Sequence, residues 1–356
     1  MKGIAERIRA WDGAGVVCRY DRQTDSWIFI SLHDGTLGPF TGGTRMNCYA
    51  SLGEALEDGQ RLAAGMTAKW AALGMPYGGG KAVLAVPGPL EGEAREGLLR
   101  RYGRLIELLG GRFRTGEDLG TTPDDMCVLA EETEYVHGYD RETGKKVDPS
   151  PYTALGVWSG IVAGCGEVFG SDDLASRTVL VEGLGHVGWR LAELLRESGA
   201  GLLVADIDSA RSERAAREFD ATVVEPRQVP STECDVYAPS AIGATVNRDT
   251  IPRLACRLVA GSANNQLGEA ADADRLVERG IAYAPDYVIN GGGAMSFGLM
   301  STGEKNPEVL RGRVETIGET VRELLREAAG RGESPVAAAD RRVERVLAAA
   351  AAESGR

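Results

Sequence analysis

Histidine and cysteine are scarce in this sequence, and neither is arranged for metal or disulfide chemistry. The chain has 3 histidines and 6 cysteines, with no CxxC pair, no HExxH and no GxSxG segment. The cysteines stand singly along the chain, so we expect neither a zinc site nor a disulfide framework, and buried free thiols are the predicted state. No metal is therefore expected, and serine-nucleophile chemistry is a poor candidate.

Positive charge and long hydrophobic runs are also scarce. Lys and Arg number 40 against 52 Asp and Glu, a net charge of −12. Nucleic-acid binding depends on clustered Lys and Arg, so we expect no nucleic-acid partner. No stretch approaches the ~18 apolar residues of a membrane span. The opening MKGIAERIRAWDG lacks the apolar core of a signal peptide, and we expect a cytoplasmic protein with no membrane partner.

The chain that remains is globular and, at 356 residues, long enough for two hydrophobic cores. Apolar runs at 16–20 and 27–32 predict paired strands around a polar turn. Ser51 and Glu54 match a capping box and predict a helix that ends near Lys69. Further patterns predict a strand at 82–86, a helix at 94–109, and a helix that begins near Thr122 and Pro123. This alternation predicts an α/β first domain.

The segment GMTAKWAALGMPYGGGK holds two lysines, Lys69 and Lys81, with Gly78–Gly80 directly before the second. A lysine acts as a base at neutral pH only if burial or a cationic neighbour lowers its pKa, and two lysines facing one site would meet that need. The glycines predict a glycine-rich loop that a small ligand can approach closely. Taken alone, such a segment is more often a helix with a surface lysine followed by a flexible turn.

A second domain is predicted to begin after Pro149 and Pro151. A helix is expected at 153–168, and TVLVEGLGHVG then joins a hydrophobic strand to a glycine turn and a helix. The run LLVAD forms the next strand and ends at Asp206. A lone GxGxxG also occurs where a helix merely packs closely on a sheet, but strand, glycine turn, helix and terminal acid together predict dinucleotide binding. Long helices are expected at 307–329 and 335–351.

The chain resembles the amino-acid dehydrogenase superfamily of glutamate, leucine, phenylalanine and valine dehydrogenases, most closely its leucine/phenylalanine/valine branch. The resemblance spans nearly the whole sequence and is carried by LGPFTGGTRM, GMTAKWAALGMPYGGGKAVL, TGEDLGTTPDDM, SPYTALGVWSG, VEGLGHVG, APSAIGATVN, AGSANNQLG and YAPDYVINGGG. It implies an α/β substrate-binding, catalytic and oligomerisation domain at 1–148 and an NAD-binding Rossmann domain at 149–330. It also implies a C-terminal helix at 331–356 that returns to the first domain, and a homo-oligomer.

The resemblance also implies roles for individual residues. Lys81 is the expected catalytic lysine, Asp118 its partner in proton transfer, and Lys69 the residue that holds the substrate carboxylate. The other implied substrate-binding residues are Thr41, Gly42, Gly43, Met66, Gly116, Asn265, Ala294 and Phe297. The implied cofactor-binding residues are Thr153, Gly183, Gly185, His186, Val187, Gly188, Asp206, Ala238 and Asn264.

The expected function is NAD-dependent, reversible oxidative deamination of a hydrophobic L-amino acid to its 2-oxo acid and ammonia. By the resemblance, the small residues Gly116 and Ala294 line the side-chain pocket and favour phenylalanine or tryptophan over valine. Phe297 either opposes this by filling part of the same pocket or offers an aromatic face to a bound ring. Asp206 favours NAD over NADP, with Arg211 as the residue that opposes this preference. The departures from the family pattern are Trp70, Glu182, Ser240 and the segment 291–297.

Four alternatives remain open. The first is a leucine or valine dehydrogenase. A glutamate dehydrogenase is the second, and it would need a cation where the uncharged Thr41 stands. The third is a non-catalytic nucleotide-binding paralogue, which the intact Lys69, Lys81 and Asp118 oppose. The fourth is a plain Rossmann reductase acting on alcohols, for which no Tyr-x-x-x-Lys is apparent.

Overall fold

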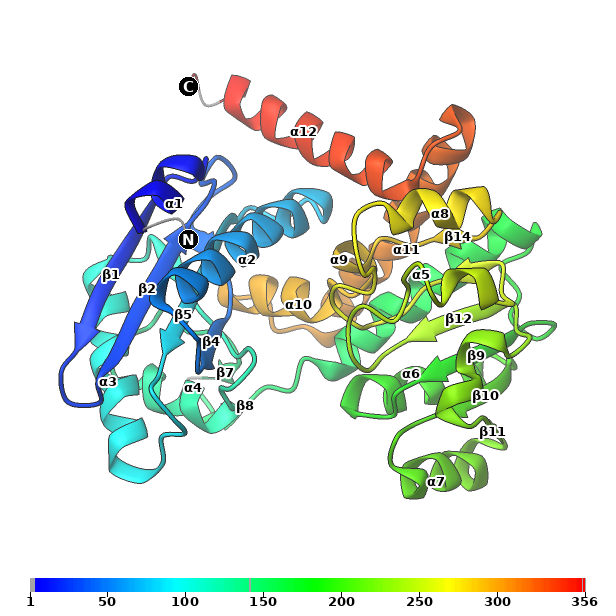
Figure 1. The fold of residues 1–356 in the computed structure, drawn as a ribbon, viewed down its shortest axis with the longest axis horizontal. Helices are drawn as coiled ribbons and strands as arrows, with labels where there is room; N and C mark the ends of the chain where they lie inside the picture. Colours follow the sequence, from blue (N-terminus) through cyan, green and yellow to red (C-terminus); the bar gives the residue numbers. More distant parts are fainter. Residues whose placement is uncertain (1–3, 141, 354, 356) are drawn as a thin grey trace. The chain divides into compact units, whose positions relative to one another are not determined.

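The computed structural model describes residues 4–140, 142–353 and 355. The chain divides into two compact units (Figure 1). Unit 1 contains the residues up to Asp148 together with those from Val343 onward, and unit 2 contains Pro149–Arg342. Among the described residues, no helix is both long enough and apolar enough to cross a membrane.

Unit 1 is built on a mixed sheet with the strand order β1-β2-β5-β3-β6, and β4 also pairs with β5. Its strands are β1 (Gly15–Asp21), β2 (Ser26–Leu32), β3 (Phe40–Thr41), β4 (Thr44–Asn47), β5 (Gly78–Ala85) and β6 (Phe113–Arg114). The first two strands pair antiparallel with each other, which confirms the prediction of paired strands at 16–20 and 27–32. Strand β5 pairs with β2 on one edge and with β3 and β4, which both run parallel to it, on the other. Every residue of this central strand is buried.

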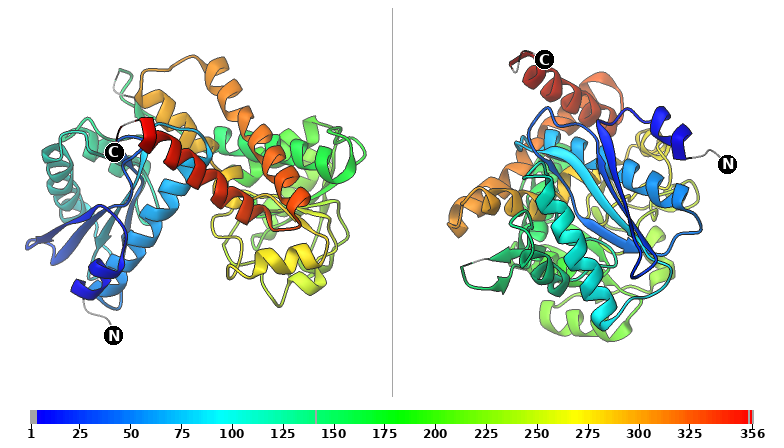
Figure 2. Two further views of the ribbon diagram at one scale, coloured as in Figure 1. Left: turned by 90° about the horizontal axis from the view of Figure 1, so that it is seen from above. Right: turned by 90° about the vertical axis from the view of Figure 1, so that its left-hand side faces the viewer.

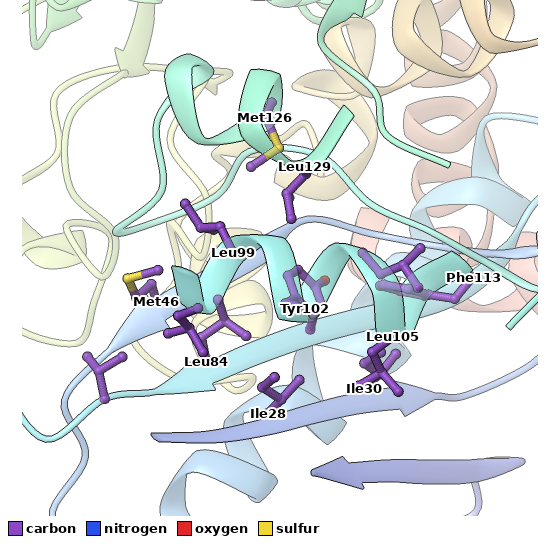
Figure 3. Close-up of a cluster of buried hydrophobic side chains, with 14 residues drawn as sticks. Ile28, Ile30, Met46, Leu84, Leu99, Tyr102, Leu105, Phe113, Met126 and Leu129 are labelled. Atoms are coloured by element: carbon purple, nitrogen blue, oxygen red, sulfur yellow. The ribbon is translucent and has the colours of Figure 1, made fainter. Parts of the chain in front are cut away.

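Two long helices cover opposite faces of this sheet (Figure 2). Helix α2 (Leu52–Ala72) begins where the side chain of Ser51 accepts a hydrogen bond from the backbone of Glu54, which is one of the two bonds of the predicted capping box. Side chains alternate between the faces of a strand, so Val83 packs toward α2. Leu84 packs with α3 (Gly92–Leu108) in the larger core cluster, which Figure 3 shows.

The expectation that Gly78–Gly80 form a loop is wrong, because these glycines open strand β5 and are buried. A Cβ atom built on Gly79 would lie 2.0 Å from the side-chain oxygen of Thr67 on α2, and one on Gly80 would lie 2.9 Å from Phe113. Small residues are therefore needed here so that neighbouring elements can pack closely against β5. None of the three has a positive φ, so the backbone does not turn at this point.

Unit 1 also contains four short elements and the C-terminal part of the last helix. The short elements are α1 (Ile4–Ala10), α4 (Pro123–Ala130), β7 (Tyr139–Asp140) and β8 (Lys145–Lys146). Helix α4 begins with a capping box between Thr122 and Asp125, at the start predicted for it. Helix α12 (Pro335–Glu353) starts in unit 2 and continues into unit 1.

Unit 2 contains a parallel sheet with the strand order β11-β10-β9-β12-β13-β14. The strands are β9 (Thr178–Glu182), β10 (Gly201–Ala205), β11 (Thr222–Val223), β12 (Val236–Pro239), β13 (Leu258–Val259) and β14 (Ala282–Tyr283). The helices are α5 (Ser150–Phe169), α6 (His186–Glu197), α7 (Ser209–Phe219), α8 (Asp272–Glu278), α9 (Asp286–Ile289), α10 (Gly292–Ser301) and α11 (Pro307–Arg331). This arrangement confirms the predicted Rossmann-type α/β fold.

Candidate active site

Lys81 lies on the central strand β5 of unit 1, and its side chain is only 6% exposed. Its ammonium nitrogen is 3.0 Å from the carboxylate oxygen Oδ2 of Asp118. The structure thus brings together two residues that sequence reasoning paired, although they lie far apart in the chain. Burial removes water from the lysine and lowers its pKa, while the charge of Asp118 acts in the opposite direction.

Asp118 stands on a loop that is fastened to β4. The backbone of Thr44 donates a hydrogen bond to the carbonyl of Gly116 (2.8 Å), and Met46 donates to Leu119 (2.9 Å). The hydroxyl of Thr121 reaches the carbonyl of Thr44 at 2.9 Å. These contacts hold the loop beside the strand and fix the carboxylate of Asp118 next to Lys81.

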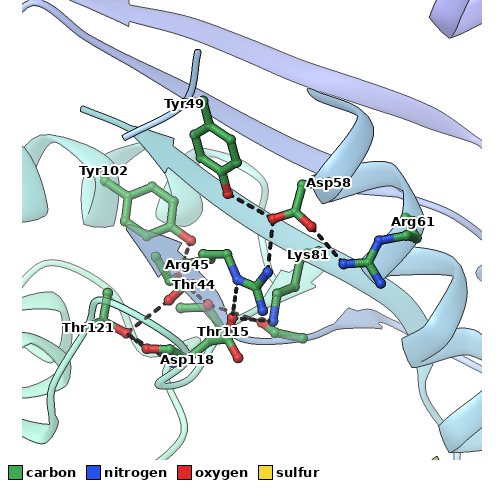
Figure 4. Close-up of polar contacts among 11 residues, drawn as sticks. Thr44, Arg45, Tyr49, Asp58, Arg61, Lys81, Tyr102, Thr115, Asp118 and Thr121 are labelled. Carbon is green, nitrogen blue, oxygen red and sulfur yellow. Dashed lines mark hydrogen bonds and ion pairs between the residues drawn. The ribbon is translucent and has the colours of Figure 1, made fainter. Parts of the chain in front are cut away.

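The carboxylate of Asp118 also contacts a second cation. Arg45 on β4 donates from Nε to the same oxygen, Oδ2, at 2.9 Å (Figure 4). Burial acts to raise the pKa of Asp118, but the charges of Lys81 and Arg45 outweigh it and the pKa is lowered. Asp118 is therefore held in its ionised form. Sequence reasoning assigned no role to Arg45, although this residue lies within the GPFTGGTRM segment.

Among the predicted substrate-binding residues of unit 1, Gly43 packs directly beside Asp118. A Cβ atom built on Gly43 would lie 2.9 Å from Cβ of Asp118, and one on Gly42 would lie 3.2 Å from the side chain of Met66. Lys69 is in the last turn of α2. The next residue along, Trp70, donates its indole N–H to the carbonyl of Thr41 at 2.9 Å.

Thr41 and Gly116 have different surroundings. Thr41 is buried, and its hydroxyl donates to the carbonyl of Pro39 at 3.1 Å. Around Gly116, a Cβ atom would meet only Cβ of His137 within 4 Å, at 3.5 Å, among the residues that the structure describes. Position 116 therefore has space beside it, and its backbone conformation is one that any residue can adopt.

The glycine loop of unit 2 follows β9. Gly183 has a φ of +97°, which favours glycine, and a Cβ atom built on Gly188 would lie 1.9 Å from the carbonyl oxygen of Gly183. Beside Gly185 the space is open, and this residue precedes helix α6, which begins with His186 and Val187. The first N–H groups of a helix have no acceptor within the helix. The loop therefore fits a dinucleotide pyrophosphate placed at the start of α6.

Asp206 follows β10, as predicted, and its carboxylate has two backbone partners. It accepts hydrogen bonds from the N–H of Leu184 (2.7 Å) in the glycine loop and from that of Asp208 (2.8 Å). Arg211 lies 3.9 Å from the same carboxylate. The acid therefore ties the glycine loop to the end of the neighbouring strand, a contact that the sequence did not reveal.

The other predicted residues of unit 2 lie on β12, α5, α10 and the loop after β13. Ala238 is on β12, and Thr153 is near the start of α5. Ala294 and Phe297 are on α10, whose first turn packs on Thr153, since a Cβ atom on Gly293 would lie 2.5 Å from the Thr153 hydroxyl. These assignments, and those in unit 1, stay predictions.

Asn264 and Asn265 follow β13. The side chain of Asn290 donates a hydrogen bond to the amide oxygen of Asn264 at 2.7 Å, a support that sequence reasoning missed. Asn265 has a φ of +51°, which is uncommon for a residue other than glycine. Its carbonyl accepts from the backbone of Ala244 at 2.7 Å, so the loops after β12 and β13 are joined at this edge of the sheet.

Comparisons with known proteins identify the family. The model described as Glu/Leu/Phe/Val dehydrogenase, dimerisation domain, matches residues 23–135. The model described as Glutamate/Leucine/Phenylalanine/Valine dehydrogenase matches residues 201–353. The leucine dehydrogenase of Bacillus cereus is 43% identical over 345 residues, covering 97% of this chain and 93% of its own length.

Two further relatives agree with these matches. The phenylalanine dehydrogenase of Lysinibacillus sphaericus is 39% identical over 323 residues, covering 89% of this chain and 84% of its own. The crystal structure of L-tryptophan dehydrogenase from Nostoc punctiforme matches with a TM-score of 0.86 and 37% identity, over 98% of this chain and 99% of that one.

The class of protein is therefore an oxidoreductase that acts on the CH–NH2 group of amino acids. The chain belongs to the Glutamate/Leucine/Phenylalanine/Valine dehydrogenase family. Membership of this family implies a nicotinamide cofactor, and the glycine loop after β9 fits one.

Proposed function

We propose that the chain is an NAD-dependent dehydrogenase that converts a bulky hydrophobic or aromatic L-amino acid reversibly to its 2-oxo acid and ammonia. The observation that carries this proposal is the contact of 3.0 Å between the buried Lys81 and the ionised Asp118. A buried lysine whose pKa is lowered can serve as a base near neutral pH, and a neighbouring carboxylate can move protons.

The residues of unit 1 supply the acid–base steps. Lys69 would bind the substrate carboxylate. The ionised Asp118 first takes a proton from the substrate ammonium group. A nicotinamide held at the glycine loop of unit 2 would supply the hydride acceptor for the substrate Cα, so that the amine is oxidised to an imine. Lys81 as a neutral amine takes a proton from the water that attacks the imine carbon, and Asp118 returns the proton it took from the substrate ammonium to the nitrogen. The C–N bond then breaks while the ionised Asp118 accepts the hydroxyl proton, and the 2-oxo acid and ammonia are released.

Two positions support an apolar substrate side chain. Thr41 is buried and uncharged, and its hydroxyl is already bonded to a backbone carbonyl, so it offers no cation to a glutamate side chain. Gly116 leaves open space beside the loop that carries Asp118. The relatives named for leucine, tryptophan and phenylalanine agree with a hydrophobic substrate.

A panel of amino acids tests the proposal. Catalytic efficiencies for L-phenylalanine, L-tryptophan, L-leucine, L-valine and L-glutamate are measured by NADH formation. We expect phenylalanine or tryptophan to exceed valine, and glutamate to be barely used. Leucine or valine in first place would establish the branched-chain alternative, and glutamate in first place would overturn the argument from Thr41.

A substitution at Gly116 tests whether this position lines the pocket for the substrate side chain. The φ of Gly116 is outside the left-handed region, so Gly116→Val should fold normally. It should lower the efficiency for phenylalanine and tryptophan more than that for valine, by roughly tenfold, because a single misfit in a hydrophobic pocket is worth ~1 to 3 kcal/mol. Equal losses for all substrates would show that position 116 does not line the pocket.

We also propose that the chain forms a homo-oligomer, because the family model that matches residues 23–135 is described as a dimerisation domain. Light scattering should then give a mass that is a multiple of 37.7 kDa. A monomer at micromolar concentration would contradict this. The cytoplasmic location stays a prediction.

A further inference from the structure

Arg45 bridges two carboxylates that come from distant parts of the chain. Its Nε donates to Oδ2 of Asp118, and its Nη1 donates to Oδ2 of Asp58 on α2, each at 2.9 Å (Figure 4). Arg45 is opposite Val83 in the β4–β5 register, so its side chain lies on the same face of the sheet as that of Lys81. The side chains of Arg45 and Asp58 are 18% and 17% exposed, and water therefore screens this pair only weakly.

The two cations meet one atom of Asp118. Lys81 Nζ and Arg45 Nε are 3.0 Å and 2.9 Å from the same oxygen, Oδ2. No residue in the described part of the chain makes a hydrogen bond to the other oxygen, Oδ1, and the side chain of Asp118 is 25% exposed. One oxygen is thus fixed by the protein, while the other remains available to a reacting group.

Asp58 in turn is held on its far side. Tyr49 donates its hydroxyl to Oδ2 of Asp58 at 2.8 Å, and Arg61 donates to Oδ1 at 2.8 Å. The burial of Tyr49 and its bond to Asp58 raise the pKa of its phenol, so it remains a donor. The carboxylate of Asp58 is therefore held in one position by its own partners, and from helix α2 it fixes the guanidinium of Arg45.

We propose that Arg45 is a positioning residue for the reaction: anchored by Asp58, it fixes Oδ2 of Asp118 against Lys81 and leaves Oδ1 to exchange a proton with the substrate. This inference rests on the proposed function. Arginine suits the task because its planar guanidinium can donate to two carboxylates at once in a fixed geometry, which the single ammonium of a lysine cannot do.

The charge of Arg45 has a second effect on the same pair. It lowers the pKa of Lys81, adding to the larger effect of burial, whereas Asp118 and Asp58 act in the opposite direction. Other charged or titratable groups on the neighbouring elements include Arg61 and the half-buried Lys69 on α2, and Tyr49 after β4. Arg61 and Tyr49 contact Asp58. Removing the charge of Arg45 should therefore raise the pKa of Lys81, so that its ammonium group keeps its proton up to a higher pH.

The test compares pH profiles of kcat/KM for the best amino acid of the panel. The proteins are the wild type, Arg45→Gln, Arg45→Lys and Asp58→Asn. In Arg45→Gln the acidic limb, which reports the deprotonation of Lys81, should move to higher pH by about one unit. In Asp58→Asn, which removes an anion, the limb should move to lower pH. Arg45→Lys keeps the charge, so its limb should stay near that of the wild type while kcat falls.

The outcomes separate the possible failures. Melting temperature and NADH binding are measured for each variant, so that a loss of folding is recognised. A purely structural role would lower the melting temperature and kcat of Arg45→Gln without moving the limb, and that result overturns the inference. Limbs that move in the same direction in Arg45→Gln and Asp58→Asn would also overturn it. A wild type that oxidises no amino acid of the panel contradicts the proposed function, and the inference falls with it.

Discussion

Lys81 and Lys69 belong to the same segment of sequence but lie in different surroundings, and burial distinguishes their roles. Lys81 is enclosed on the central strand, and its pKa is lowered. We expect Lys81→Ala to lower kcat by ~10² or more, because removing a general base has an effect of this size. The glycine loop lies in the other unit, so cofactor affinity should change little. Steady-state kinetics and NADH fluorescence titration measure the two quantities.

A control for this variant is Lys145→Ala, at an exposed lysine on β8. It should keep the turnover of the wild type. Near-normal turnover of Lys81→Ala at saturating substrate would show that the base is another residue.

His137 gives the stability of the protein a pH dependence with a defined direction. It is buried beside Gly116, and burial, together with the charge of Arg114, lowers its pKa from 6.5 to about 4. Between these values the unfolded chain binds a proton that the folded chain does not, so stability is lost as the pH falls from 6.5 through about 4. At 1.36 kcal/mol per unit, the loss is about 3 kcal/mol.

Urea unfolding at several pH values between 7 and 4 checks this expectation. His137→Gln removes the titrating group, and its free energy of unfolding should fall less steeply with acid than that of the wild type. The carboxylates titrate in both proteins, so their contribution cancels in the comparison. Parallel curves for the two proteins would show that His137 is not held neutral.

At the residue scale, the sequence paired two residues that the structure places in contact, but it did not predict the residue that links them to α2. Lys81 and Asp118 were paired through the resemblance to the family, and the structure places them 3.0 Å apart. The bridge through Arg45 was not predicted, because it depends on carboxylates from α2 and from a loop far along the chain. Such a contact has no signature in the spacing of residues.

At the scale of elements, β5 shows why a local signal can mislead. Glycine is depleted in strands, so three glycines in a row indicate a loop. The contacts that make glycine necessary come from Thr67, Asp34 and Phe113, which are distant from β5 in sequence. The strand–glycine–helix pattern at β9 was predicted correctly, because the local residues there specify the turn themselves.

The packing of α2 on β5 can be tested with one methyl group. Gly79→Ala places Cβ 2.0 Å from the Thr67 oxygen and 2.4 Å from the Ala63 carbonyl, so α2 would have to move. We expect the free energy of unfolding to fall by about 1 to 3 kcal/mol, as overpacking of a core usually causes. Chemical denaturation measures the change.

Gly65→Ala is the matched control for that substitution. Gly65 lies on α2 itself, and a Cβ atom there would meet nothing within 4 Å. Alanine should therefore be neutral or stabilising by up to ~1 kcal/mol through its higher helix propensity. If both variants were equally stable, the close approach at Gly79 would have no energetic consequence.

At the scale of the whole molecule, we expect charge to influence the choice between NAD and NADP. The net charge is −12, and NADP carries an additional phosphate that NAD lacks, so the overall field disfavours NADP. The local arrangement acts in the same direction. Asp206 lies at the strand end where a carboxylate repels a 2′-phosphate. Arg211, which could receive that phosphate, is 3.9 Å from Asp206 and 3.5 Å from Asp208, and these carboxylates already engage its charge.

We therefore expect kcat/KM with NAD to exceed that with NADP by at least about tenfold, a difference of ~1.4 kcal/mol. Asp206→Ser should shrink this ratio, since it removes the repulsion and releases Arg211, although NAD affinity should fall as well because the tie to Leu184 is lost. Glu213→Gln, on the exposed side of α7, removes one negative charge elsewhere in the same unit and serves as the control for net charge. An equal change of the ratio in both variants would assign the preference to the overall field, and a wild type that prefers NADP would show that Asp206 does not select the cofactor.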